Sequence, residues 1–133
     1  MIVLDRDILV KLVESNQEVI RHLKQYRTEE WTIPSLVAWE SYKAQDSRQE
    51  MRQAQTRLQS DFDRIIDFSD DTALEAAYLD ERLTSQSVSL DPVDLLNLAT
   101  AYEEGGTFVT HNERDFDKAP LLELADIDVV HTS

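Results

Sequence analysis

Short apolar runs alternate with longer amphipathic segments along this chain. The runs at 2–4, 31–33, 65–68 and 107–110 predict four strands, and a run at 127–130 predicts a fifth. Apolar side chains recur at helical spacing over 8–26, where Ser15 and Asn16 indicate a break and a cap between two helices.

The remaining helices are predicted from the residues at their ends. The segment 41–63 is polar and contains neither glycine nor proline, which favours either one extended helix or a helical hairpin. Proline, glycine and capping residues indicate helices that begin at 34–35, span 73–83, run from 92 to the glycine pair 105–106, and cover 121–124.

Strands that alternate with helices are typical of an α/β fold in which helices cover both faces of a parallel sheet. The expected architecture is therefore a three-layer α/β/α domain with a central parallel sheet of four or five strands. A length of 133 residues fits one domain, 1–133, with a core of its own.

Composition narrows the chemistry. The chain has no cysteine, so disulfides, thiolate metal sites and cysteine nucleophiles are excluded, and any metal must bind oxygen or one of three histidines. No apolar stretch approaches the roughly 20 residues of a membrane span. We therefore expect a cytoplasmic protein with no membrane contact.

The formal net charge of −14 is large for this length and opposes compaction unless salt or bound cations screen it. Adaptation to a salty, halophilic cytoplasm explains the charge, because at about 1 M salt the screening length is only about 3 Å. The alternative is an acidic protein from an ordinary cytoplasm that has a basic partner.

Several acidic residues coincide with the predicted ends of strands. Asp5 and Asp7 follow the first strand, Glu40 follows the second, and Asp115 follows the fourth, while Asp94 lies in the first turn of a helix that Asp91 caps. In open parallel sheets, the functional crevice forms outside the carboxyl ends of the strands. We therefore expect Asp5, Glu40, Asp94 and Asp115 to meet there.

Crowded carboxylates raise one another's pKa unless a cation neutralises them, so this cluster predicts a site for Mg²⁺ or Mn²⁺. An oxygen-only site that keeps waters on the ion suits attack by an activated water on a phosphodiester. Hydrolysis of a phosphate ester is the predicted chemistry.

The joint pattern resembles the PIN-domain family, especially VapC-type toxins, over essentially the whole chain. The matching segments are 4–9, Glu40 after 33–35, 94–101, and 108–116. The resemblance implies that Asp5, Glu40, Asp94 and Asp115 surround one or two divalent ions and cleave RNA. It also implies a cognate antitoxin, which blocks the site, and a homodimer.

Other residues receive supporting roles. The resemblance implies that Thr110 and Asn112 support the site, and it departs at Arg6 and Asp7, where the family usually has a small hydroxyl residue and then Asn. Asp7 is expected to support the ligands, ahead of binding the ion itself. Arg6 is expected either to offset that charge or to contact a phosphate of the RNA.

The histidines and several arginines have either a surface role or a role beside the site. His111 is expected to be a partly exposed loop residue beside the site, ahead of a general base. His22 and His131 are expected on the surface. Arg48 and Arg52 either line an RNA path or pair with neighbouring acids.

Two rival functions stay open. A strand that ends in Asp5-Arg6-Asp7 is also the nucleophile signature of haloacid dehalogenase-type phosphatases, although Lys118 is the only late lysine and the chain is short for that fold. The second rival is a catalytically silent acidic binding module. Because a −14 protein repels RNA at low salt, a cleavage assay in dilute buffer can miss activity.

Overall fold

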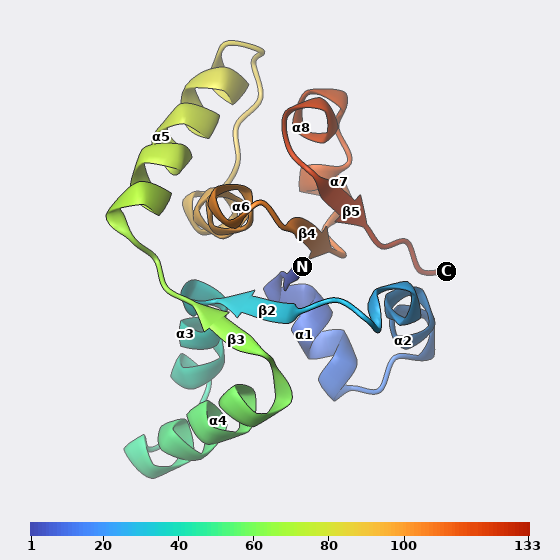
Figure 1. The fold of residues 1–133 in the computed structure, drawn as a ribbon, viewed down its shortest axis with the longest axis vertical. Coiled ribbons are helices and arrows are strands. Elements are labelled where there is room, and N and C mark those ends of the chain that lie inside the picture. The colour runs from blue at the N-terminus through green and yellow to red at the C-terminus, as the bar shows by residue number, and fades with distance from the viewer.

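A computed structural model describes all 133 residues and shows five parallel strands in one sheet with helices on both faces (Figure 1). The strands lie in the order β3-β2-β1-β4-β5, and every neighbouring pair is parallel. This confirms the α/β prediction, with five strands. Their bounds are β1 (Ile2–Leu4), β2 (Trp31–Pro34), β3 (Arg64–Ile66), β4 (Thr107–Thr110) and β5 (Ile127–Val129).

The helices form one layer on each side of the sheet (Figure 1). Helices α1 to α4 cover one face and α5 to α8 the other, and none is long and apolar enough to cross a membrane. Their bounds are α1 (Arg6–Val13), α2 (Gln17–Leu23) with a short 3-10 turn at Lys24–Tyr26, α3 (Ser35–Lys43), α4 (Arg48–Asp61), α5 (Asp70–Thr84), α6 (Pro92–Glu104), α7 (Glu113–Phe116) and α8 (Ala119–Leu124).

Strand β1 contributes side chains to the core on both sides of the sheet, because successive side chains of a strand point to opposite faces. Ile2 and Leu4 pack into the cluster beneath α1 to α4, whereas Val3 packs into the cluster beneath α5 to α8. All three side chains are fully buried. At roughly 1.5–3 kcal/mol for each buried large apolar side chain, this central strand anchors both halves of the core.

Of the two alternatives predicted for 41–63, the structure shows the helical hairpin, because the Ser47 hydroxyl accepts a hydrogen bond from the Glu50 amide at 3.1 Å and starts a new helix. Local structure departs from the sequence prediction in two other places. Strand β3 stops at Ile66, where its pairing with β2 ends, so 67–68 lie outside it. The short helix α7 was not predicted, and the Asn112 side chain caps it.

The strand order places a topological switch at β1. From β1 the chain builds outward to β2 and β3, and then returns to place β4 on the other side of β1. Helices that leave β1 and β4 diverge at such a point and open a crevice at the carboxyl ends of the two strands. Asp5 directly follows β1, and Thr110 ends β4.

Candidate active site

A cleft of about 460 Å³ opens at the carboxyl ends of the central strands. Acidic side chains from three separate helices or their caps face it, with two basic side chains at its wall. Its lining residues are Asp5, Arg6, Asp7, Val10, Lys11, Glu40, Asp94 and Asn112. The cleft thus brings together three of the four predicted acids, and the predicted helix start at Asp94 does lie on this rim.

Asp5 is the most buried of these acids, with 5% of its surface exposed. One carboxylate oxygen accepts a hydrogen bond from the Arg6 amide at 2.8 Å, which caps α1, and the other accepts from the Thr110 hydroxyl at 2.8 Å. The Asp5 amide also donates to the Val109 carbonyl at 2.9 Å. These contacts fix Asp5 across the switch between β1 and β4.

Asp7 lies beside Asp5 and contacts the end of β4 and the residue that follows it. Its carboxylate accepts a hydrogen bond from the His111 backbone amide at 3.1 Å and lies 3.5 Å from the Thr110 hydroxyl, which donates its hydrogen bond to Asp5. His111 is half-buried, and its ring contacts the Thr132 hydroxyl at 2.8 Å. His111 therefore positions Asp7 through its backbone, whereas its ring contacts the C-terminal segment.

Asp115 lies in α7, next to the residues that line the cleft. The Asn112 side chain donates to the Asp115 carboxylate at 2.9 Å and accepts from the Asp115 amide at 3.3 Å. The Asn112 amide in turn donates to the Thr110 hydroxyl at 3.1 Å. Thr110 and Asn112 thus connect Asp5 to Asp115 through one chain of hydrogen bonds.

Three aspartates of the cleft resist ionisation. Burial, followed by the neighbouring charge of Asp7, raises the pKa of Asp5 to about 7. Burial, followed by the charges of Asp91 and Asp115, raises the pKa of Asp94 to about 6. Burial also raises the pKa of Asp7. Each shift has the direction expected for carboxylates that share a partly dry site without a cation.

A hard divalent ion fits this donor set. The predicted ligands Asp5, Glu40, Asp94 and Asp115 offer only oxygen atoms, which suit Mg²⁺ or Mn²⁺, and their repulsion is the kind that a divalent charge relieves. No three of these acids bring ligand atoms within 4.8 Å of one another, so their side chains must move closer to share one ion. Asp7 is a further carboxylate that lines the cleft beside these ligands.

The structure separates the predicted arginines. Arg6 lines the cleft, whereas Arg48 and Arg52 line a different pocket on α4 together with Tyr42 and Met51. The assignment of Arg48 and Arg52 to an RNA path stays a prediction, and it concerns a surface that does not line the cleft.

Two features were missed in the sequence. Lys11 lines the cleft, and its spacing of four from Asp7 was the available signal, because residues i and i+4 share a helix face. His22 is not a simple surface residue: its ring lies 2.7 Å from the Asp128 carboxylate, which also accepts a hydrogen bond from Tyr26. Asp128 lies in β5, 106 residues after His22, so this pairing has no local signal in the sequence.

Comparisons with known proteins identify the family of the chain. The PIN domain profile matches residues 2–122. No curated protein matches the sequence. Since the match spans most of the chain, the protein belongs to the PIN-domain family.

Solved structures share the fold at low sequence identity. One such structure is VapBC2 from Rickettsia felis, bound to a DNA fragment from the VapBC2 promoter. Its matching chain is 21% identical, with 97% of this chain and 98% of that chain covered and a TM-score of 0.75. A chain of a toxin–antitoxin complex from Klebsiella pneumoniae is 21% identical, with both chains fully covered and a TM-score of 0.76. A chain of FitAcB from Neisseria gonorrhoeae is 18% identical, with 98% of this chain and 97% of that chain covered and a TM-score of 0.73. The fold is therefore that of chains in toxin–antitoxin complexes.

The raised pKa of Asp5 predicts how Asp5→Asn changes stability in the metal-free protein. In the folded protein the Asp5 carboxyl keeps its proton up to about pH 7, whereas an unfolded aspartate loses its proton near the ordinary pKa of 3.8. The folded state therefore binds more protons between these values, and the free energy of unfolding falls as the pH rises through this window. Asp5→Asn removes that loss, which is at most roughly 4 kcal/mol at neutral pH.

Urea unfolding in EDTA at pH 5 and pH 7.5 measures the effect. Asp80→Asn, an exposed acid on α5, controls for the change in net charge. If the free energy of unfolding depends on pH equally in wild type and Asp5→Asn, ionisation of Asp5 does not destabilise the folded state.

Proposed function

We propose that this chain is a metal-dependent endoribonuclease and the toxin of a type II toxin–antitoxin pair. The observation that carries the proposal is the cleft at the switch between β1 and β4, which is lined by the four acids Asp5, Asp7, Glu40 and Asp94. Membership in the PIN-domain family supports it, and disfavours the phosphatase alternative.

Each residue of the cleft has a definable task in hydrolysis of an RNA phosphodiester. Asp5, Glu40, Asp94 and Asp115 would hold Mg²⁺ or Mn²⁺, and Thr110 and Asn112 keep two of these carboxylates in place through hydrogen bonds. When bound, the ion supplies an activated water and stabilises charge that develops on the phosphate.

Arg6 is suited to contact the RNA backbone. It lines the cleft, its Nε atom is buried, and that atom has no hydrogen-bond partner within the protein. A buried donor without a partner carries a desolvation cost that a phosphate oxygen would relieve. Arg6 and Lys11 are the two cations that line this acidic cleft, so they offset part of the repulsion between the protein and RNA.

A groove beside the cleft is suited to an antitoxin segment. It has a volume of about 310 Å³, lies between α1, α3 and α4, and shares Arg6 and Val10 with the cleft. Leu9, Val13 and Leu58 supply apolar lining, so an extended apolar segment could bind there and place a basic side chain among the carboxylates. Complexes of similar chains with antitoxins support this proposal.

Removing a metal ligand should abolish RNA cleavage. Asp94→Asn and Asp5→Asn are each expected to lower Mg²⁺-dependent cleavage about a hundredfold or more, because each withdraws a charge that holds the ion. Cleavage of a fluorescent RNA is measured from low to high KCl, since repulsion between RNA and a −14 protein weakens binding in dilute buffer.

Asp80→Asn serves as the matched control and should cleave RNA like wild type. If Asp94→Asn and Asp5→Asn both cleave normally at every salt concentration, the proposed active site is wrong. A protein that is inert in every condition would favour the silent binding module.

Arg6→Ala should weaken substrate binding more than it slows the chemical step. Loss of one charge-assisted phosphate contact is expected to raise KM about tenfold at nearly constant kcat. Arg6→Lys keeps the charge and should recover part of the loss. Steady-state kinetics in Mg²⁺ test this, and an unchanged KM in Arg6→Ala would exclude a role in RNA binding.

Val13→Glu should separate neutralisation by the antitoxin from toxicity. Val13 is 79% exposed in the groove, so a carboxylate there leaves the fold intact but opposes burial of an apolar segment. Growth after induction of the toxin is measured with and without the protein encoded next to it. We expect Val13→Glu to remain toxic and to escape rescue.

Leu74→Glu is the matched control, since Leu74 is also exposed at 66% but lies on α5, on the other side of the sheet. Rescue of Val13→Glu as complete as that of Leu74→Glu would remove the groove from the antitoxin interface.

A further inference from the structure

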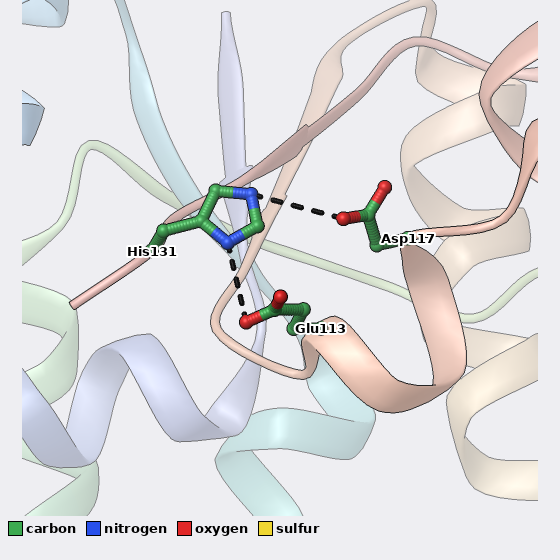
Figure 2. Close-up of side chains that lie close together, drawn as sticks. All are labelled: Glu113, Asp117 and His131. Carbon is green, nitrogen blue, oxygen red and sulfur yellow. Dashed lines mark ion pairs between the residues drawn. The ribbon is translucent and has the colours of Figure 1, made fainter. Parts of the chain in front are cut away.

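A second cluster of potential metal ligands lies on α7, outside the carboxylate cleft. Glu113 and Asp117 are one helical turn apart, and His131 reaches them from the C-terminal segment (Figure 2). One ligand atom from each of the three residues lies within 4.8 Å of the other two. It is the single group of three such side chains in the chain that meets this distance.

The imidazole of His131 lies between the two carboxylates. Its Nδ1 atom lies 3.2 Å from Glu113, and its Nε2 atom lies 3.9 Å from Asp117. A distance of 3.9 Å is too long for a hydrogen bond, so the contact with Asp117 is the looser of the two. Both ring nitrogens therefore face carboxylate oxygens, and either nitrogen of a neutral ring can offer its lone pair to a metal ion.

The same distances suit ligands of one ion. With metal–ligand bonds of about 2.0–2.2 Å, two ligands of one ion lie about 3–4 Å apart. The exposed fractions of the three side chains, 56%, 62% and 42%, leave them free to rotate onto a common ion and leave room for water as a further ligand. The two carboxylates balance the charge of a divalent cation.

The donor set selects a different metal from that of the cleft. Imidazole nitrogen favours Zn²⁺, Ni²⁺ or Co²⁺ over Mg²⁺, which prefers oxygen alone. We propose that Glu113, Asp117 and His131 form a second metal site, which binds a Zn²⁺-class ion and clamps the C-terminal segment onto α7. The evidence for this site does not rest on the proposed nuclease activity.

The clamp would act on an element that the cleft also uses. Helix α7 has four residues, and Asp115 lies between Glu113 and Asp117. The C-terminal segment already contacts the adjacent loop, where the Val130 amide donates to the Thr110 carbonyl at 2.8 Å and Thr132 pairs with His111. An ion at His131 would therefore tie together the two segments that flank Asp115.

Calorimetric titration of the full-length protein with ZnCl₂ in excess MgCl₂ tests the site, since Mg²⁺ occupies oxygen-only positions. We expect one equivalent of Zn²⁺ and a rise in Tm of about 5 °C or more at saturation. His131→Ala should lose that equivalent, and Glu113→Gln and Asp117→Asn should each weaken it about tenfold or more. Glu123→Gln, an exposed acid on α8, should bind like wild type.

Asp94→Asn separates this site from the cleft, because it removes a cleft ligand and should keep the Zn²⁺ equivalent. Circular dichroism confirms that each variant is folded, and the two carboxylate variants carry the test if His131→Ala does not fold. The proposal is overturned if wild type binds no Zn²⁺, if Asp94→Asn loses it, or if binding is indifferent to all three substitutions.

Discussion

The hydrogen-bonded carboxylate of Asp5 is the contact on which the arrangement of the cleft depends. One oxygen caps α1 through the Arg6 amide and the other accepts from Thr110 at the end of β4, so Asp5 joins the two strands at the switch in strand order. Burial at this junction also raises the pKa of Asp5 to about 7. The geometry of the fold therefore places a charge where the protein alone does not neutralise it.

Thr110 and Asn112 extend this constraint to α7. The Thr110 hydroxyl donates a hydrogen bond to Asp5 and accepts one from the Asn112 backbone amide. The Asn112 side chain in turn donates to the Asp115 carboxylate. A helix of four residues has little stability of its own, because nucleation fixes several backbone dihedrals for few hydrogen bonds. The position of Asp115 therefore depends on this cap, and on whatever holds the C-terminal segment beside it.

The strong acidity of the chain has different consequences in different places. Over most of the surface it is a solvated charge that salt can screen, whereas in the cleft it concentrates at groups that are partly dry. Arg6 and Lys11 are the exceptions on the cleft wall. An RNA strand that approaches the cleft would meet repulsion from its carboxylates, which those two side chains and a bound cation would offset.

The sequence by itself determined the order of strands and helices along the chain except for α7, the parallel sheet, and the placement of Asp5 and Glu40 beyond strand ends, because apolar periodicity, caps and chain direction are local properties. The match of the PIN domain profile to residues 2–122 confirms the family that those residues indicated. Only the tertiary structure decided that Lys11 lines the cleft, that Arg48 and Arg52 do not, and that His22 pairs with Asp128. It also decided the break between α3 and α4 and the meeting of His131 with α7. The pairing of His22 with Asp128 and the meeting of His131 with α7 depend on packing between segments far apart in the chain, for which a single sequence carries no local signal. Lys11 and the break at Ser47 had local signals, but the tertiary structure was needed to choose between the alternatives.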